Sequence, residues 1–270
     1  MMKALLLAAG LGTRLRPLTD FLPKCLAPIG GRPLLEYWLA NLFHAGFDQL
    51  LVNTHHLPEL VERYVRQTPW ADRTTLVHEN VLAGTAGTVW LNRKFFGGDA
   101  FLVAHADNFS VFDPAEMVRR HAERAAGTVM TMMTFETKTP RSCGIVTLDT
   151  QGVVTGFHEK AQNPPGNLAN AAVYILEREV VDLIGTLDSR HPDFSTEVIP
   201  KLLGRISTYP NRVFHLDIGS PDGWLEAQSM ADLVQQDAST ASAWTNILDS
   251  DNCRIRRAFG EFQHKVGSKN

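Results

Sequence analysis

The fold is decided by the stretch Lys3-Ala-Leu-Leu-Leu-Ala-Ala-Gly-Leu-Gly-Thr-Arg-Leu-Arg-Pro17. Its apolar start, Lys3–Ala9, predicts a buried strand, and Gly10 and Gly12 follow directly. Glycines just after a buried parallel strand let backbone N–H groups approach phosphate oxygens, and such sheets bind ligands beyond the carboxyl ends of their strands. The stretch therefore favours a phosphate-binding loop, with a purely structural turn as the alternative for a bare Gly-x-Gly.

Two familiar glycine loops do not fit this stretch. Leu15 stands where a dinucleotide-binding fingerprint needs its third glycine, and the chain contains no GxxxxGK[ST] motif. Arg14 lies in the loop, and Lys24 follows in Leu22-Pro23-Lys24-Cys25. A guanidinium and an ammonium are the two side-chain groups with which proteins hold phosphates, so both strengthen the phosphate interpretation.

Outward from this loop, short apolar runs alternate with amphipathic helical patterns. The first half predicts strands at 49–54, 74–78 and 100–105 and helices at 34–45, 60–66 and 86–94. Later segments predict a helix from Pro114 capped by Asp113, strands at 128–135, 145–149, 153–157, 171–176 and 213–216, and helices at 195–204 and 221–235. We therefore expect an α/β fold: a Rossmann-like, doubly wound, mainly parallel mixed sheet with helices on both faces.

The composition narrows the functional classes. The 270 residues are 44% hydrophobic and 20% charged and carry a net charge of −3, which argues against a nucleic-acid partner. The three cysteines have no CxxC spacing, which excludes a cysteine zinc site and suits a reducing compartment. No segment approaches the about 20 apolar residues of a membrane span, so we expect a cytoplasmic protein without a membrane partner.

Three motifs together resemble the signature of sugar-1-phosphate nucleotidyltransferases. They are Leu6-Leu-Ala-Ala-Gly-Leu-Gly-Thr-Arg-Leu-Arg-Pro-Leu-Thr19, Pro23-Lys24 and Pro28-Ile-Gly-Gly-Arg-Pro-Leu-Leu-Glu36. The resemblance, closest to the mannose-1-phosphate guanylyltransferase branch, implies that the loop wraps a nucleoside triphosphate (NTP). Arg14 would brace the β and γ phosphates, and Lys24 would contact the reacting ones. The implied nucleotide-binding residues are Leu7, Ala8, Ala9, Gly10, Gly12, Thr13, Arg14 and Lys24.

The resemblance extends to about residue 232 and implies a domain organisation. A nucleotidyltransferase domain would span 1–236, with an NTP-binding part at about 1–110 and a sugar-phosphate-binding part at about 111–236. Residues 237–270 would form a partly helical C-terminal appendage.

Two aspartates are candidate metal ligands. Asp107 follows the predicted strand 100–105, and Asp217 follows the strand 213–216, so both stand where a strand meets a loop. Nucleotidyl transfer needs a divalent cation, and Mg²⁺ accepts one or two carboxylates while keeping water ligands. The resemblance matches both aspartates to metal-binding positions that also touch substrate. His105 and His215 each precede an aspartate by two residues, so a zinc or manganese site of two histidines and two aspartates is an alternative to histidines that pack or bond to neighbours.

The remaining site residues come from the resemblance. Glu79, Gly84 and Thr85 occupy positions expected to contact the base, and a carboxylate at 79 suits guanine, which offers two donors. The expected sugar-phosphate contacts are Gly144, Glu159, Lys160 and Asn170. Glu159 would accept hydrogen bonds from sugar hydroxyls and Lys160 would hold the sugar's phosphate; without the resemblance, a surface ion pair is the better interpretation of these two residues.

The sequence therefore predicts a Mg²⁺-dependent enzyme that forms an NDP-sugar and pyrophosphate, with Arg14, Lys24, Asp107, Lys160 and Asp217 as its catalytic residues. GTP with mannose 1-phosphate or a related heptose 1-phosphate is the first choice. The alternatives are uridylyl or thymidylyl transfer to glucose 1-phosphate or an amino sugar 1-phosphate, a non-catalytic nucleotide-sugar-binding subunit, and a nicotinamide-dependent dehydrogenase. A homo-oligomer is compatible with the sequence.

Overall fold

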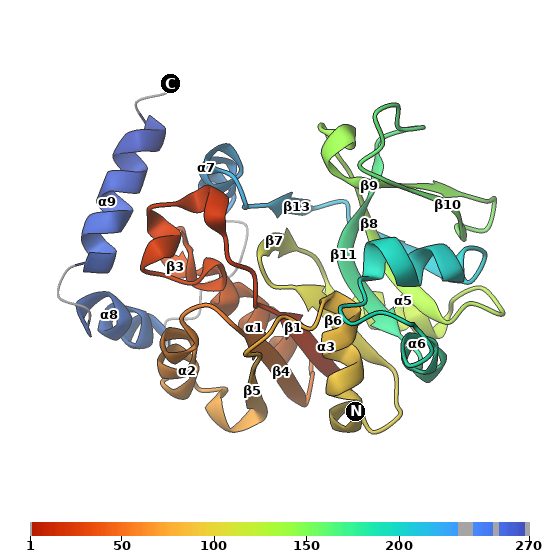
Figure 1. The fold of residues 1–270 in the computed structure, drawn as a ribbon, viewed down its shortest axis with the longest axis horizontal. Helices are drawn as coiled ribbons and strands as arrows, with labels where there is room; N and C mark the ends of the chain where they lie inside the picture. The colour runs from red at the N-terminus through yellow and green to blue at the C-terminus, as the bar shows by residue number, and fades with distance from the viewer. Residues whose placement is uncertain (1, 232–239, 251–253, 268–270) are drawn as a thin grey trace. The chain divides into compact units, whose positions relative to one another are not determined.

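The computed structural model describes residues 2–231, 240–250 and 254–267 (Figure 1). The chain forms two compact units that alternate along the sequence. Unit 1 comprises Met1–Leu5, Leu82–Ala104 and Phe112–Phe214, and unit 2 comprises Leu6–Val81, His105–Val111 and His215–Asn270. The predicted boundary between 236 and 237 lies outside the described residues, so the two-part domain organisation stays a prediction.

Unit 2 contains the strands that were predicted first. β1 (Lys3–Leu7), whose end belongs to unit 2, lies next to β4 (Gln49–Thr54) in the sheet, and β4 lies next to β5 (Thr74–His78). β4 and β5 run parallel, as the sequence predicted, with Leu50 opposite Thr74 and Thr54 opposite His78. The predicted helices between these strands are α1 (Leu34–His44) and α2 (Pro58–Arg66).

Smaller elements of unit 2 were not predicted. β2 (Pro28–Ile29) and β3 (Arg32–Pro33) form an antiparallel pair before α1. β7 (Asn108–Val111) pairs with the predicted strand β13 (Phe214–Asp217). The two-residue strands β2 and β3 carry too little periodicity to be recognised in a sequence.

Three helices complete the C-terminal part of unit 2. They are α7 (Pro221–Ser229), α8 (Ala241–Ser250) and α9 (Arg254–Gly267), with α8 beside α2 in Figure 1. The predicted helix 221–235 therefore ends at Ser229, and its last four positions lie outside the described residues. Trp224 packs edge-to-face on Phe262 of α9, with ring centroids 5.2 Å apart. The tail thus contributes to the core of unit 2.

A buried carboxylate ties the start of α8 to earlier helices. Glu36 of α1 is 2% exposed and accepts hydrogen bonds from Arg32 Nη1 at 2.8 Å and Tyr64 Oη at 2.8 Å. Thr240 Oγ1, immediately before α8, donates a third bond at 2.5 Å. Burial and the Glu36 charge raise the pKa of Tyr64, which keeps that hydroxyl protonated as a donor.

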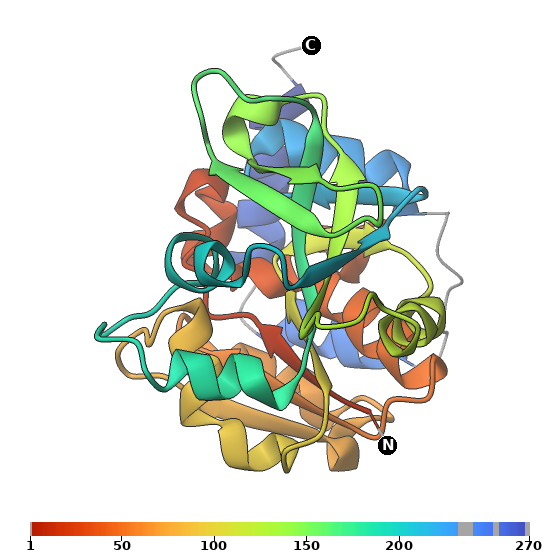
Figure 2. The same ribbon diagram turned by 90° about the vertical axis from the view of Figure 1, so that its right-hand side faces the viewer.

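Unit 1 contains a mixed set of strands. β11 (Leu168–Leu176) runs antiparallel to β6 (Phe101–His105), β8 (Met130–Glu136) and β9 (Gly144–Leu148). β10 (Val154–Glu159) pairs antiparallel with β9, and β12 (Ile206–Pro210) pairs parallel with β8 (Figure 2). The change to consecutive strands after Gly127 was predicted, and the α/β fold with a mixed sheet is confirmed.

The helices of unit 1 differ from the predictions in three places. α5 (Pro114–Ala122) begins as predicted, since Asp113 Oδ1 accepts from Ala115 N at 2.9 Å and Glu116 N at 3.1 Å. The predicted helix 86–94 is divided into α3 (Thr85–Leu91) and α4 (Arg93–Phe96). The predicted helix 195–204 is instead a π-helix, Phe194–Val198, followed by a 3₁₀ turn, Ile199–Leu202. Pro200 explains that correction, because its nitrogen has no hydrogen for an α-helical bond.

The helix α6 (Arg178–Ile184) was not predicted. Across the described residues, no helix combines the length and the apolar character that crossing a bilayer would require.

Candidate active site

Lys24 is a buried cation shared by two carboxylates. Its Nζ donates to Asp107 Oδ2 at 2.8 Å and to Asp217 Oδ1 at 3.0 Å, and only 5% of its side chain is exposed. Lys24 opens a 3₁₀ turn, Lys24–Leu26, directly after Pro23. The structure thus brings the two acidic residues singled out in the sequence onto one positive charge.

Paired strands position the two aspartates. Asp107 lies in the tight turn between β6 and β7, and Asp217 is the last residue of β13. Because β7 and β13 pair with each other, the pairing carries both aspartates to the same place in unit 2. Ala106 N donates to Leu7 O at 3.0 Å, which ties the Asp107 turn to the end of β1. Both residues stand where a strand meets a loop, as expected, although Asp217 is itself the last residue of its strand.

Asp217 has two further partners. Arg14 Nη2 lies 3.3 Å from Asp217 Oδ2, and Gly219 N donates to Asp217 Oδ1 at 2.7 Å. A Cβ at position 219 would lie 2.5 Å from Arg14 Nη2 and 2.7 Å from Asp217 Oδ1, so the contact requires glycine. Burial acts to raise the pKa of Asp217, but Lys24, Gly219 and Arg14 outweigh it and hold that pKa below its ordinary value. Asp217 is therefore an ionised carboxylate.

The glycine loop packs directly against this cluster. Gly12 has a φ of 61°, and a Cβ there would lie 2.9 Å from Thr19 Cγ2 and 3.0 Å from Lys24 Cβ. Thr19 Oγ1 donates to Gly12 O at 2.8 Å and fixes the turn. A Cβ at Gly10 would lie 3.6 Å from Asp107 Oδ2, so the loop backbone passes beside the carboxylate. The 3₁₀ turn Thr13–Leu15 then presents Arg14, whose side chain is 67% exposed.

Glu79 is held by a network at the ends of β4 and β5. Its Oε1 accepts from Asn53 Nδ2 at 3.0 Å, and Asn53 Oδ1 accepts from Ala8 N at 2.8 Å. Glu79 N donates to Thr54 O at 2.8 Å, and His55 Nδ1 lies 2.7 Å from Glu79 O. A carbonyl oxygen only accepts, so His55 Nδ1 is the donor. The sequence did not identify Asn53 as a site residue, although an amide inside the apolar strand Gln49–Thr54 is the signal that could have found it.

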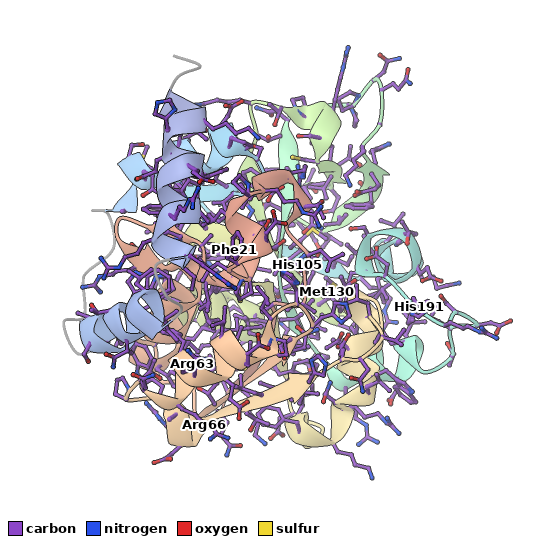
Figure 3. The ribbon with its side chains drawn as sticks, turned by 60° about the vertical axis from the view of Figure 1, so that its left-hand side comes forward. Phe21, Arg63, Arg66, His105, Met130 and His191 are labelled. Atoms are coloured by element: carbon purple, nitrogen blue, oxygen red, sulfur yellow. The ribbon has the colours of Figure 1, made fainter. Side chains whose placement is uncertain are left out.

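The two histidines beside the aspartates occupy interior positions. His215 Nδ1 lies 2.6 Å from Ser110 Oγ. Burial lowers the pKa of His215 to about 3, and nearby His105 acts in the same direction. The Asp217 and Asp107 charges act to raise this pKa but do not outweigh burial, so the ring is neutral. His105, labelled in Figure 3, ends β6. Within the described ranges, no three His, Cys, Asp or Glu side chains gather as a metal-binding group, and the His215 ring lies within hydrogen-bond distance of Ser110.

The predicted sugar-phosphate residues lie together in unit 1. Gly144 is opposite Glu159 in the β9–β10 pair, and a Cβ at Gly144 would lie 2.5 Å from the Phe157 ring and 2.7 Å from Glu159 Oε2. Lys160 N donates to Cys143 O at 3.1 Å, and Lys160 Nζ lies 3.5 Å from Glu159 Oε1. The Lys160 side chain is 67% exposed and its φ is 45°, in the left-handed region. This hairpin therefore presents a cation outward.

Asn170 shapes a bulge in β11, the strand next to this hairpin. Its Oδ1 accepts from Ala172 N at 2.9 Å, and its Nδ2 donates to Tyr174 Oη at 2.7 Å. Ala172 has a φ of 53°, in the region that favours glycine, and the β8–β11 register shifts between Asn170 and Tyr174. The side-chain bonds of Asn170 hold this irregular backbone in place.

Gly84 and Thr85 begin α3 and contact a later loop of unit 1. Gly84 has a φ of 83°, and a Cβ there would lie 2.6 Å from the backbone of His191, which is labelled in Figure 3. Thr85 Oγ1 donates to Asp193 Oδ2 at 2.8 Å and accepts from Phe194 N at 2.9 Å. The Thr85 hydroxyl thus fastens the loop before the π-helix.

The predicted site residues divide between the units. Unit 2 holds the loop residues Leu7, Ala8, Ala9, Gly10, Gly12, Thr13 and Arg14 together with Lys24, Glu79, Asp107 and Asp217. Unit 1 holds Gly84, Thr85, Gly144, Glu159, Lys160 and Asn170. Chemically, the first group offers a basic loop and two carboxylates, and the second offers an exposed cation beside a carboxylate.

Comparisons with known proteins show the family of this chain. The chain matches the protein family described as "Nucleotidyl transferase" over residues 3–233. It is 33% identical over 241 residues to a UTP–glucose-1-phosphate uridylyltransferase of Synechocystis sp., covering 83% of this chain and 62% of that protein. It is 30% identical over 242 residues to a mannose-1-phosphate guanylyltransferase of Mycobacterium tuberculosis, covering 86% and 64% respectively. The chain thus spans less than two thirds of the length of either relative.

A solved structure shows the same fold. It is a putative glucose-1-phosphate thymidylyltransferase from Bacillus anthracis in complex with sucrose, with a TM-score of 0.79 and 19% sequence identity. The match covers 89% of this chain and 99% of that one.

Proposed function

This chain belongs to the nucleotidyl transferase family, and from that membership we propose that it joins a sugar 1-phosphate to an NTP, forming an NDP-sugar and pyrophosphate. The observation that carries the proposal is the buried Lys24 ammonium shared by Asp107 and Asp217 beside the glycine loop. The lysine side chain is only 5% exposed and pairs with two carboxylates at strand ends. This arrangement differs from an ordinary surface ion pair, because lysine is rarely buried.

The proposed reaction needs no protein nucleophile. A phosphate oxygen of the sugar 1-phosphate, already ionised, forms a bond to the α-phosphorus of the NTP. The bond from that phosphorus to the bridging oxygen breaks, and the electron pair leaves with pyrophosphate. The chain's part is to align the two anions and stabilise the developing charge. We assign Arg14 and Lys24 to the NTP phosphates and Lys160 to the sugar phosphate.

Asp107 and Asp217 fit a bound Mg²⁺. They supply hard oxygen ligands that already converge on one cation, and side-chain exposures of 30% and 53% leave room for the water ligands that Mg²⁺ keeps. The ion, when bound, would neutralise charge on the phosphates. Of the chain's own groups, Lys24 holds the two carboxylates together, and Gly219 N and Arg14 keep Asp217 ionised.

GTP with mannose 1-phosphate, or a related heptose 1-phosphate, is the proposed substrate pair. Glu79 is a carboxylate held as an acceptor by Asn53, and guanine offers N1–H and an amino group as donors. The guanylyltransferase relative supports this choice, while the uridylyltransferase relative supports the alternative of uridylyl or thymidylyl transfer to glucose 1-phosphate. A non-catalytic nucleotide-sugar-binding role is less well supported, because all five proposed catalytic residues are present: Arg14, Lys24, Asp107, Lys160 and Asp217.

The proposal is tested by incubating the purified chain with Mg²⁺, each of four NTPs and a panel of hexose, heptose and amino sugar 1-phosphates. Pyrophosphate release and the NDP-sugar product would be measured. We expect turnover with GTP and mannose or heptose 1-phosphate. Turnover with UTP and glucose 1-phosphate alone would replace the proposed pair by its alternative, and nucleotide-sugar binding without any turnover would support the non-catalytic role.

A further inference from the structure

Asn53 connects two parts of unit 2 that have different roles in the proposed function: the loop proposed to bind phosphate and the residue proposed to recognise the base. It lies near the end of β4, is 2% exposed, and its side-chain amide bonds to two different segments. Its Oδ1 accepts from Ala8 N, at the start of the phosphate loop, and its Nδ2 donates to Glu79 Oε1. The distances are 2.8 Å and 3.0 Å.

The backbone fixes the orientation of this amide. Ala8 N–H can only donate, so the atom of residue 53 that faces β1 must be an oxygen. The NH₂ group of Asn53 must therefore face residue 79, and the facing atom of residue 79 must be an acceptor. Turning the amide over would place two donors against each other at Ala8 and two acceptors against each other at Glu79, which is costly in a buried site.

The backbone of Glu79 is also held. Its N–H donates to Thr54 O at 2.8 Å, and its carbonyl accepts from His55 Nδ1 at 2.7 Å. With the main chain held in this way, the Glu79 side chain directly faces the group that residue 53 donates or accepts with.

We propose that Asn53 is a positioning residue that sets the hydrogen-bond polarity with which the side chain at position 79 meets the nucleobase. This inference rests on the proposed function, in which Glu79 recognises the base. Asn53 itself touches no substrate. Its N–H group requires an acceptor atom on the side chain at position 79, which suits a base edge that presents donors.

A glutamine introduced at position 79 would orient its amide according to the residue at position 53. Opposite Asn53, the side-chain oxygen of this glutamine would turn to the Asn53 NH₂ group, and its own NH₂ group would be presented to the base. Opposite an aspartate at position 53, which still accepts from Ala8 N, the NH₂ group of the glutamine would turn to that aspartate and its oxygen would be presented to the base. The same side chain at position 79 would thus present a donor or an acceptor according to residue 53.

The experiment compares wild type, Glu79→Gln, Asn53→Asp and the double variant Asn53→Asp/Glu79→Gln. Binding of GTP and of UTP is measured by titration calorimetry with Mg²⁺ and without sugar phosphate. We expect Glu79→Gln to weaken GTP binding by about 10- to 100-fold, because charge-assisted bonds to the base are replaced by facing donors. The double variant should regain at least about 10-fold in GTP affinity over Glu79→Gln.

Asn53→Asp alone gives an independent test. It places a second carboxylate about 3 Å from Glu79 Oε1, and two carboxylates at that distance cannot both be ionised. We expect a lowered ratio of GTP to UTP affinity at pH 8 that recovers as the pH falls toward 6 and one proton is shared. Asn246→Asp is the matched control, since it makes the same charge change at an exposed position of α8 and should leave both affinities unchanged.

The outcomes separate the inference from the proposed function. A wild-type chain that binds no NTP would reject the function before any variant is made. If wild type binds GTP but the double variant binds it no better than Glu79→Gln, residue 53 does not orient the side chain at position 79, and the inference is overturned. A purely structural Asn53 would instead change GTP and UTP binding equally. Circular dichroism verifies folding, and the double variant keeps a single carboxylate at the pair, so it remains informative if Asn53→Asp does not fold.

Discussion

The proposed phosphate cluster of unit 2 (Arg14, Lys24, Asp107 and Asp217) and the β9–β10 hairpin of unit 1 hold their lysines in opposite ways. Lys24 is 5% exposed and bonded to two carboxylates, whereas Lys160 is 67% exposed and lies 3.5 Å from Glu159. A buried, fully paired charge keeps its geometry without a ligand, while an exposed pair of long side chains gains little from its contact. The chain therefore builds one charge centre from buried, paired groups and leaves the other exposed to solvent.

The largest expected contrast is in thiol reactivity, since each region contains one described cysteine. Cys25, next to Lys24, is 1% exposed, and burial together with the Asp107 charge raises the pKa of Cys25 to about 12. Cys143, beside Gly144, is half-buried. Only the thiolate reacts, so alkylation of Cys25 at pH 8 should be about 10³-fold slower in the native protein than after unfolding.

The measurement is iodoacetamide labelling followed by peptide mass spectrometry. The third cysteine, Cys253, lies outside the described residues. The variant Cys253→Ser is used so that only Cys25 and Cys143 can be labelled. Native labelling of Cys25 at a rate near that of the unfolded chain would contradict the closed phosphate cluster.

Next in size is the effect of neutralising one carboxylate of the cluster. Asp107→Asn removes a charge that Lys24 and the proposed Mg²⁺ share, and we expect turnover to fall by about 10²–10³. Steady-state kinetics at saturating Mg²⁺ gives the value. Asp72→Asn, an exposed position of the same unit, is the control, and near wild-type turnover in Asp107→Asn would remove Asp107 from the site.

A smaller and more selective effect is expected at the hairpin. Lys160→Met should lower kcat/KM for the sugar 1-phosphate by about 10- to 100-fold while leaving NTP affinity within about 2-fold, because one charged bond to the sugar phosphate is lost. Lys201→Met, at an exposed position of unit 1, is the control. An equal loss of NTP affinity would contradict the separate assignment of the two lysines.

The smallest expected effect is on the stability of the fold in acid. It concerns His121, a buried polar residue with no proposed role in binding. His121 is 4% exposed and bonds to Thr131 Oγ1 at 2.7 Å and Glu177 Oε1 at 3.2 Å. Burial and the Arg124 charge lower the pKa of His121 to about 4, although Glu177 acts to raise it. The unfolded chain therefore binds the proton first, and the free energy of unfolding should decrease as the pH falls from about 6.5 to about 4.

The contribution of His121 to that decrease is at most about 1.4 kcal/mol per pH unit. His121→Gln should reduce the slope of unfolding free energy against pH in urea titrations, and His264→Gln, at an exposed position of α9, should not. An unchanged slope in His121→Gln would mean that this histidine is not kept neutral by the fold.

Much of the architecture could be predicted because its signals are local. The apolar run before Gly10 predicted β1, and Asp113-Pro114 predicted the start of α5, since caps and strand runs depend on neighbouring residues. The division of the helix predicted at 86–94, the π-helix at Phe194–Val198 and the short pair β7–β13 depend on tertiary contacts that no window of sequence contains.

The candidate site followed the same rule. Lys24, Asp107 and Asp217 were recognisable from strand ends and motifs, but their sharing of one ammonium across 83 and 193 positions was not. Asn53 was missed because a lone polar residue in an apolar segment shows its partner only in three dimensions. Mg²⁺, a cytoplasmic location, the absence of a nucleic-acid partner and a homo-oligomeric state remain predictions.

The order in which the two units occur along the chain also sets the order of their completion during synthesis. Once the ribosome has delivered Phe214, every residue of unit 1 exists, but unit 2 still lacks everything from His215 onward. Lys24 is made 193 residues before Asp217, and Glu36 is made 204 residues before Thr240. At about 5–20 residues per second, the nascent chain carries its future charge centre unassembled for on the order of 10 seconds or more. Translation therefore finishes the hairpin side first, and the segment that begins at His215 closes the phosphate cluster afterwards.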